Sequence, residues 1–309
     1  MKKFIILTTL LFLILSLISV LISSRAYAAK IINFRLDRNR IIIPTVINGS
    51  RELNLILDTG MPFDGVYLFH KELNDEIKLE NTINVHVPGA GDGEASEAIM
   101  ADSQIVSCGE MNFNNQRVII AQSATTQSFP TDGVVGQTIL GHYIIKIDFD
   151  SLKMTLFEPK TFIPDSSWFI INLEYKKGIP FLKAEVEVIK GEKVAIDIYM
   201  DISAGEPLEL LVKDHAKFTV PDNLEQKYLG TGLSGDIHGG IARIHSFSLG
   251  PYTLYDLPAT FPPAEVRSKQ EGADGILGND ALRRFNVVID PFGRKLFIRP
   301  NQSFKTPFE

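Results

Sequence analysis

Short hydrophobic runs rich in β-branched residues, separated by turn residues, follow one another along most of the chain after position 28. Runs of this kind are typical of β-strands. Pairs such as Asn48-Gly49, Lys190-Gly191 and Phe292-Gly293 are typical of the turns between strands. The runs predict strands at residues 41–43, 117–121, 144–149, 154–157, 182–189 and 287–289.

Helical patterns are few and short. We expect helices only at residues 69–73, 211–216 and 281–285, the last one after Gly278-Asn279-Asp280. A stretch rich in Pro, Asp and Ser near residues 159–167 interrupts the strand pattern and is typical of a linker. The sequence therefore predicts an all-β protein with a few short helices.

Several landmarks occur twice in the same order. The triplet Asp58-Thr59-Gly60 follows a hydrophobic run, and Asp201-Ile202-Ser203 follows another such run 143 positions later. An Asp-Gly-hydrophobic-hydrophobic-Gly segment at 132–136 returns at 274–278, 142 positions later, and a Gly-rich stretch and an Ile-Asp pair return at the same spacing. Repetition at a single spacing indicates two copies of one unit. We expect two lobes, residues 30–163 and 168–303.

The composition agrees with a folded protein that has two modest cores. The chain has 309 residues, of which 45% are hydrophobic and 22% are charged, which is far from a disordered composition. Its formal net charge is -6, which argues against a nucleic-acid partner. The single cysteine, Cys108, cannot form an internal disulfide, so the fold depends on packing.

The first 28 residues have the pattern of a signal peptide. Lys2 and Lys3 precede a long apolar stretch, and Ala26-Tyr27-Ala28 has the small-x-small form of a cleavage site. This pattern predicts export to the periplasm or the exterior. The apolar stretch is long enough just to span a bilayer, so an uncleaved membrane anchor stays open as an alternative.

The repeated motifs resemble those of pepsin-like and retropepsin-like aspartic proteases, and most closely bacterial exported forms with one retroviral-protease-like unit in each half. The resemblance rests on the Asp-Thr-Gly turn, the Gly-rich stretches and the hydrophobic-hydrophobic-Gly segments, and it covers residues 38–160 and 180–300. It implies a bilobed acid-protease-like fold and an endopeptidase that cleaves extended peptides or proteins. The implied enzyme needs no cofactor and no metal, and because both halves lie in one chain it is expected to be a monomer.

The resemblance assigns the catalytic role to Asp58 and Asp201. Two carboxylates within hydrogen-bonding range cannot both ionise cheaply, so the pair holds one proton over a range of pH. One member then acts as a general base towards water, and the other acts as an acid towards the substrate carbonyl.

Further residues are expected to support the two catalytic turns. The hydroxyl of Thr59 is suited to cross-link the turns, Gly60 is expected to adopt a backbone geometry closed to other residues, and the glycines of the repeated Gly segments allow close backbone approach. The turn-supporting residues are Thr59, Gly60, Ser203, Gly136 and Gly278.

The second turn departs from the family pattern. Ile202 has no hydroxyl, and Ser203 places a Cβ where the family has glycine, so the turn glycine would be displaced to Gly205. Either Asp201 still pairs with Asp58 and the site hydrolyses peptides, or the second half has become a support and the protein is a non-catalytic peptide-binding module. We favour the working pair because an aspartate is retained at the matching position.

The two Gly-rich stretches are expected to form flaps that close over an extended peptide and offer it backbone hydrogen bonds. Mobile surface hairpins without a ligand are the alternative. The expected substrate-binding residues are Gly89, Ala90 and Gly91 in the first flap and Thr231, Gly232 and Leu233 in the second.

Other functions fit the sequence less well. Residues 230–235 match G-x-G-x-x-G, but no long helix pattern follows to hold a pyrophosphate. The six histidines lack paired metal-binding spacing, and neither G-x-S-x-G nor a partner motif for Cys108 is present. A secreted adhesive or structural all-β protein with incidental carboxylates remains a third hypothesis.

Overall fold

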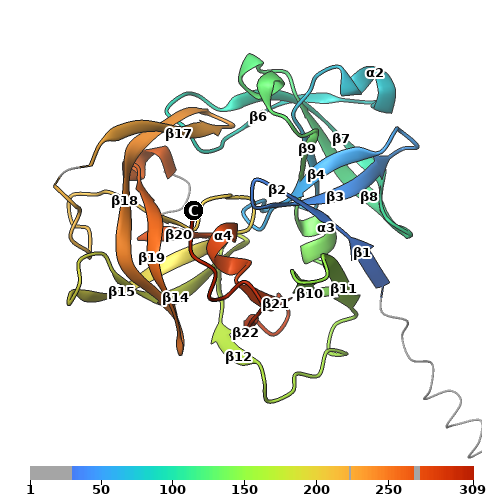
Figure 1. The fold of residues 1–309 in the computed structure, drawn as a ribbon. Coiled ribbons are helices and arrows are strands. Elements are labelled where there is room, and N and C mark those ends of the chain that lie inside the picture. The colour runs from blue at the N-terminus through green and yellow to red at the C-terminus, as the bar shows by residue number, and fades with distance from the viewer. Residues whose placement is uncertain (1–29, 223, 268–271) are drawn as a thin grey trace, which may run out of the picture. The chain divides into compact units, whose positions relative to one another are not determined.

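The computed structural model describes residues 30–222, 224–267 and 272–309. Strands dominate this range and helices are short, which confirms the predicted all-β, two-lobed fold (Figure 1). The proposed signal peptide, residues 1–28, lies outside the described residues. In the part of the chain that is described, no helix has both the length and the hydrophobicity needed to cross a membrane.

The first lobe is built on an eight-stranded sheet, counted over the described residues, with the order β2-β3-β4-β9-β5-β8-β7-β6. We call it the first-lobe sheet. Its strands are β2 (Arg35–Asp37), β3 (Arg40–Ile47), β4 (Leu53–Leu57), β5 (Gly65–Leu68), β6 (Ile83–Val87), β7 (Ser96–Cys108), β8 (Met111–Ala121) and β9 (Gly133–Val135).

The second-lobe sheet repeats this arrangement. Within the described range it also has eight strands, in the order β13-β14-β15-β20-β16-β19-β18-β17, so every strand has a counterpart at the same place in the first-lobe sheet. Its strands are β13 (Glu174–Lys176), β14 (Ile179–Glu187), β15 (Lys193–Asp201), β16 (Leu208–Leu210), β17 (Gln226–Gly232), β18 (Gly235–Leu249), β19 (Tyr252–Phe261) and β20 (Gly275–Gly278). The sequence repeat thus corresponds to a structural repeat.

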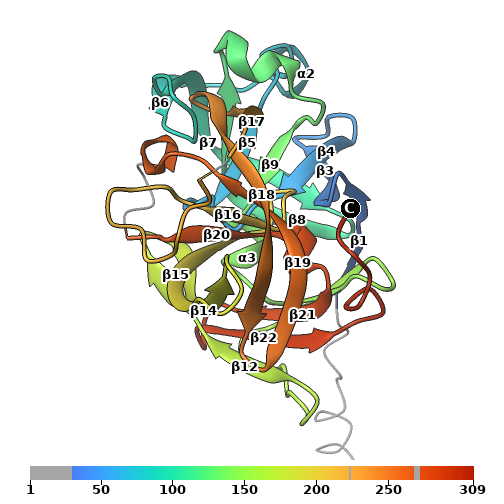
Figure 2. The same ribbon diagram turned by 60° about the vertical axis from the view of Figure 1, so that its left-hand side comes forward.

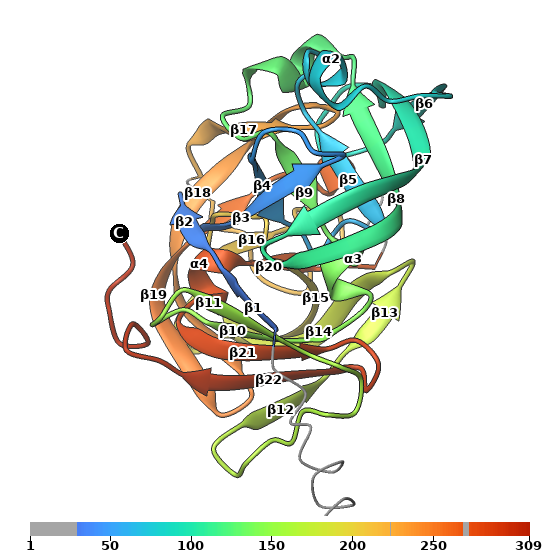
Figure 3. The same cartoon turned by 90° about the vertical axis from the view of Figure 1, so that its right-hand side faces the viewer.

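A third sheet takes strands from both halves, and we call it the shared sheet. Its described strands have the order β1-β11-β10-β21-β22-β12, and β10 pairs antiparallel with β21 across the centre. Figure 3 shows the green β10 and β11 beside the red β21 and β22. The strands are β1 (Lys30–Asn33), β10 (Ile144–Asp148), β11 (Lys153–Phe157), β12 (Phe169–Asn172), β21 (Phe285–Asp290) and β22 (Lys295–Pro300).

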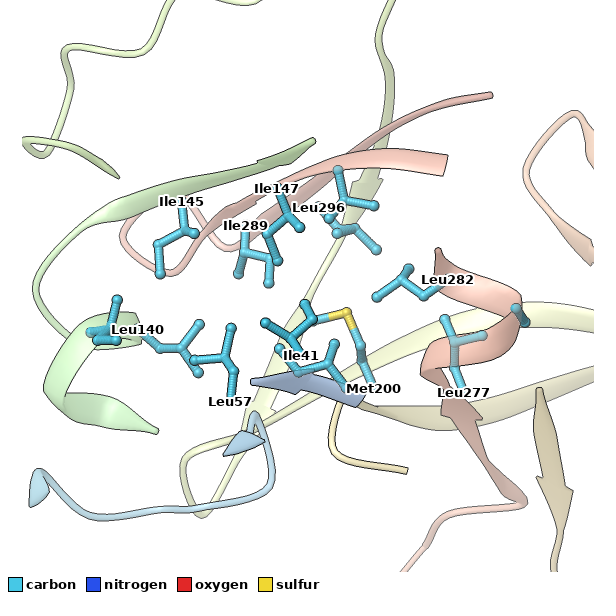
Figure 4. Close-up of a cluster of buried hydrophobic side chains, with 14 of the residues drawn as sticks. Ile41, Leu57, Leu140, Ile145, Ile147, Met200, Leu277, Leu282, Ile289 and Leu296 are labelled. Carbon is cyan, nitrogen blue, oxygen red and sulfur yellow. The ribbon is translucent and has the colours of Figure 1, made fainter. Parts of the chain in front are cut away.

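The largest hydrophobic core joins the shared sheet to both lobes. Leu57 and Met200, which directly precede the two candidate aspartates, are fully buried in one cluster (Figure 4). Ile147 and Ile289 contribute to this cluster from the shared sheet. Because densely packed side chains cannot shift independently, this core fixes the backbone just before each aspartate.

The six predicted strands are all present, although β8 begins six residues before the predicted start and β3 ends four residues after the predicted end. Two of the three predicted helices are wrong. The helix after Phe69 begins only at Leu73 (α2, Leu73–Ile77), because the backbone of Phe69 bonds to Asp132 and to the hydroxyl of Thr126. Residues 211–216 do not form a helix, because the N–H groups of Leu211 and Val212 donate to Asp274 O and Pro262 O.

Near the third predicted helix the structure has α4 (Asn279–Leu282), whose counterpart in the first half is α3 (Gln137–Leu140). Two 3₁₀ helices, Ala124–Ser128 and Ala264–Arg267, also occupy matching positions between a long strand and the Asp-Gly motif of each half. These four short helices therefore follow the same repeat as the sheets, whereas α2 has no counterpart among the described residues of the second half.

Candidate active site

Each candidate aspartate lies at the end of a central strand. Asp58 directly follows β4, which runs parallel to β9, and its N–H donates to Val135 O at 2.9 Å. Asp201 is the last residue of β15. This strand runs parallel to β20, and Asp201 is paired with Gly278 of that strand. The two aspartates therefore occupy equivalent places in the two lobe sheets.

Thr59 connects the two turns. Its hydroxyl donates to Met200 O at 2.6 Å and accepts from Ile202 N–H at 3.1 Å, so one buried side chain holds the backbone on both sides of Asp201. Ile202 is fully buried and has no hydroxyl with which to return these bonds. The hydroxyl link made by Thr59 is therefore one-sided, because position 202 makes no equivalent bond to the first turn.

The two turns hold their carboxylates in the same way. Gly60 N–H donates to Asp58 Oδ1 at 2.6 Å, and Ser203 N–H donates to Asp201 Oδ1 at 2.9 Å. A Cβ placed on Gly60 would lie 3.1 Å from Asp58 Oδ1 and 3.8 Å from Asp201 Oδ2, so both carboxylates border the same small volume.

Two expectations about these turns are wrong. Gly60 does not have a positive φ, so the site needs a glycine there for space beside the two carboxylates and not for unusual backbone geometry. Gly205 does not replace the missing turn glycine, because Ser203 itself makes the bond that Gly60 makes. The carbonyl of Gly205 instead accepts a hydrogen bond from the Asn39 side chain of the other lobe.

Ser203 also adds a bond that a glycine could not make. Its hydroxyl donates to Asp201 Oδ1 at 2.6 Å, in addition to the bond from its N–H. Asp201 therefore accepts two hydrogen bonds from one residue. Charge-assisted bonds of this kind are among the stronger ones in proteins, so they fix the orientation of this carboxylate.

The electrostatics of the pair favour one retained proton. Burial and the negative charge of Asp201 raise the pKa of Asp58 from 3.8 to about 7, although hydrogen bonds from Gly60, Ser203 and Met61 oppose this rise. Desolvation disfavours the charged form of a carboxyl group, and a like charge nearby has the same effect. The raised pKa of Asp58 therefore lets the pair keep one proton at mildly acidic pH.

The carboxylates open into a cavity of about 460 Å³. This volume is within the range of typical small-ligand sites. Its lining comes from both lobes, and besides the aspartates it includes Gly60 and Ser203 of the turns. Segments 87–90 and 231–233 line the same cavity, so the expected flap residues Gly89, Ala90, Thr231, Gly232 and Leu233 face the site.

The two flap hairpins meet at their tips. Figure 2 shows the β6–β7 and β17–β18 hairpins close together. Gly89 N–H donates to Ser234 Oγ at 3.0 Å, Ser234 N–H donates to Ala90 O at 2.9 Å, and Gly93 N–H donates to Ser234 O at 2.6 Å. Gly91, the remaining expected flap residue, donates to Val266 O at 3.2 Å. The structure therefore has both flaps closed over the aspartates.

Gly136 and Gly278 permit close packing behind the turns. A Cβ on Gly136 would lie 2.7 Å from Asp58 O, and a Cβ on Gly278 would collide with Glu206 O. Side chains cannot be accommodated at such distances without moving the turn backbone. Both glycines are therefore required by space at the base of the site.

The sequence analysis missed the structural task of the aspartates that begin each Asp-Gly segment. Asp132 Oδ2 accepts Asn54 N–H at 2.7 Å, and Asp274 Oδ2 accepts Asp197 N–H at 2.9 Å. Each bond ties the strand that leads to a candidate aspartate to the segment beside it. The repetition of these aspartates at the same spacing was the available signal.

A second missed group is the ion pair of Arg267 with Glu209 on the second-lobe side of the cavity. These residues have no charged counterparts in the first half, so no repeated motif pointed to them. Among the described residues, no group of three or more His, Cys, Asp or Glu side chains is arranged to hold a metal ion.

The fold has known relatives among solved structures. The crystal structure of an aspartic proteinase from Irpex lacteus matches 90% of this chain and 99% of that protein, with a TM-score of 0.55 and 12% sequence identity. The fold is pepsin-like. No protein-family model matches the chain, and no curated protein is similar to it in sequence. At this identity the likeness concerns the fold.

Proposed function

We propose that the protein is an aspartic-type endopeptidase that hydrolyses peptide bonds with water activated by Asp58 and Asp201. The observation that carries the proposal is the convergence of these two carboxylates, from equivalent turns of the two lobes, on one cavity under two flaps. A pepsin-like fold supports the same reaction class.

The proposed reaction begins with a water molecule between the carboxylates. Asp201 takes a proton from the water as its oxygen attacks the peptide carbonyl carbon, and Asp58 donates its proton to the carbonyl oxygen. A tetrahedral diol results. The C–N bond then breaks as Asp201 passes its proton to the nitrogen, while Asp58 regains a proton from one hydroxyl and the carboxylic acid forms.

The altered second turn is compatible with this reaction. Ser203 supplies the N–H bond that a glycine supplies in the first turn, and Thr59 holds both neighbours of Asp201. The non-catalytic alternative rested on the expectation that Ile202 and Ser203 would displace Asp201. These contacts support the hydrolase instead.

The closed flaps support an extended peptide or protein as substrate. Their tips are bonded to each other, so a peptide enters only when these bonds open, and the freed N–H and C=O groups are then available to its backbone. We further propose that the enzyme is an exported monomer of the tandem retropepsin-like type, since both catalytic turns belong to one chain.

Digestion of a broad peptide library from about pH 4 to about pH 8 tests the hydrolase. The wild type should cleave, and Asp58→Asn and Asp201→Asn should each lower the rate by a factor on the order of 10² to 10⁴, as expected for loss of a general acid or base. Asp214→Asn, which alters an exposed carboxylate, is the matched control and should retain wild-type activity.

Two results would contradict the proposal. If the folded wild type cleaves no peptide under any condition, the proposed hydrolase activity is wrong. Full activity in Asp201→Asn together with an inactive Asp58→Asn would show that the two carboxylates do not act as a pair.

A further inference from the structure

Equivalent rows of side chains cross the two lobe sheets, and each row contributes to the lining of the cavity. In each lobe sheet, one row of paired residues crosses from strand to strand and includes the residue two positions before the candidate aspartate. The first-lobe row contains Ile42, Ile56, Val134, Tyr67, Ile119 and Met100. The second-lobe row contains Phe181, Tyr199, Ile276, Glu209, Thr260 and Ile241.

The two rows differ in chemistry. The first-lobe row is apolar apart from the hydroxyl of Tyr67, which bonds to Ser96 at 3.0 Å. At matching places the second-lobe row has Tyr199 for Ile56, Glu209 for Tyr67 and Thr260 for Ile119. Four residues of the first-lobe row line the cavity with largely hydrophobic side chains, namely Ile42, Ile56, Tyr67 and Val134. The second-lobe row contributes Tyr199 to the lining, and we call this side of the cavity the polar wall.

Arg267 completes the polar wall. Its Nε and Nη2 donate to the two carboxylate oxygens of Glu209 at 2.7 and 2.9 Å, and the two side chains are only 14% and 13% exposed. Arg267 lines the cavity. Its Nη1 has no hydrogen-bond partner among the described residues. The pair is neutral as a whole, but the two bonds to Glu209 leave other N–H donors of the guanidinium unused.

Two hydroxyls in this row are also unused. Within the described parts of the chain, Tyr199 Oη and Thr260 Oγ1 are buried and have no hydrogen-bond partner. Tyr199 is 1% exposed and lines the cavity, and the positive charge of Arg267 and the negative charge of Asp201 both act on it. A buried polar group without a partner is costly, so native proteins rarely keep one unless a ligand or water completes it.

We propose that Tyr199 and Arg267 form a subsite for an uncharged amide side chain, glutamine or asparagine, of the peptide substrate. This inference rests on the proposed peptidase function and adds its substrate preference. An amide carbonyl accepts from Arg267 Nη1, and an amide NH₂ donates to Tyr199 Oη. On the opposite wall, Ile42, Ile56 and Phe69 suit a large hydrophobic side chain.

Charge decides between an amide and a carboxylate. The positive charge of Arg267 is already balanced by Glu209, and the aspartate pair with one proton keeps a negative charge nearby. A substrate carboxylate would add a further negative charge to this region, whereas an amide makes the same hydrogen bonds without that repulsion. A basic side chain would be repelled by the positive charge of Arg267.

Defined peptides test the subsite. After library digestion has located the scissile bond, peptides that differ only by Gln, Glu or Leu at one flanking position are compared by kcat/KM. At one flanking position the wild type should cleave the Gln peptide with a higher kcat/KM than the Glu and Leu peptides. Tyr199→Phe should reduce the ratio of kcat/KM for the Gln peptide to that for the Leu peptide about tenfold. Tyr67→Phe, which removes a buried hydroxyl from the opposite wall, is the matched control and should leave the ratio unchanged.

A second variant addresses the guanidinium. Arg267→Met combined with Glu209→Gln removes both charges together and leaves no unpaired buried charge. It should also lose the preference for Gln, and thermal unfolding of each variant establishes that it is folded. The inference is overturned if the wild type has no amide preference, or if neither Tyr199→Phe nor the double variant changes that preference.

Binding separates this inference from the hydrolase proposal. If the wild type cleaves nothing, labelled Gln and Leu peptides are titrated against it and against Tyr199→Phe. Tighter binding of the Gln peptide that disappears in Tyr199→Phe would support the subsite while the hydrolase fails. Equal binding of both peptides would overturn the subsite as well.

Discussion

The raised pKa of Asp58 makes a prediction about stability that needs no substrate. Folding raises this pKa from 3.8 to about 7, so the folded protein binds a proton on Asp58 that the unfolded chain has released. The stability contributed by that proton is fully present below about pH 4 and is lost as the pH rises through about 7. Asp58→Asn, which carries an amide that cannot ionise, removes this dependence.

The expected magnitude follows from the pKa difference. One pKa unit corresponds to about 1.36 kcal/mol, so the free energy of unfolding of the wild type should fall by about 4 kcal/mol, relative to Asp58→Asn, between about pH 4 and about pH 7. Burial is the largest cause and the charge of Asp201 the second. Asp201→Asn should therefore keep the larger part of the same dependence and show a smaller total fall than the wild type.

Chemical denaturation of the wild type, Asp58→Asn and Asp201→Asn at several pH values measures these differences. Asp214→Asn is again the control, because an exposed carboxylate should leave the wild-type curve unchanged. If the wild type and Asp58→Asn keep a constant difference over this range, Asp58 does not retain a proton near neutral pH. The assignment of Asp58 as the acid would then be wrong.

Three further predictions concern the framework of the site. Thr59→Val removes the hydroxyl between the two turns and leaves two buried backbone groups unpaired, so thermal and chemical denaturation should show a loss of about 2 to 4 kcal/mol; Thr59→Ser, which keeps the hydroxyl, should lose less. Gly136→Ala should lower peptidase activity more than Gly49→Ala at an open surface turn, because its Cβ would press on Asp58 O; equal activity in both would refute this. The bonds of Asp274 to Lys213 and Lys217 help lower its pKa, so the stability that this carboxylate contributes should be present above about pH 4 and lost at lower pH. If the free energies of unfolding of Asp274→Asn and the wild type keep a constant difference down to acidic pH, this prediction is wrong.

Local patterns explain why much of the fold was predictable. β-branched runs such as residues 117–121 have no competing helical signal, and the structure confirms them as strands. Residues 211–216 were predicted to be helical and are not, because loop residues distant in sequence take the N–H groups of Leu211 and Val212. Local sequence does not report such long-range backbone bonds.

The second turn could not be resolved from the sequence for the same reason. Ile202 lacks the hydroxyl and Ser203 is not the glycine of the family pattern, and these departures indicated that the second turn had lost its function. In the structure, however, the N–H and the hydroxyl of Ser203 both donate to Asp201. Thr59, more than a hundred residues earlier, bonds to the backbone on both sides of Asp201, although Ile202 makes no return bond to the first turn. A side chain in one half therefore holds the altered turn of the other.

The sequence by itself determined the all-β class, the duplication and the pair of candidate aspartates, because strand periodicity and repeated motifs are properties of order along the chain. Only the tertiary structure decided that the two turns meet, that Asp58 is the member with the raised pKa, and that one cavity wall is polar. These properties depend on distances between residues that are remote in sequence, since burial, charge interaction and hydrogen bonding act through space.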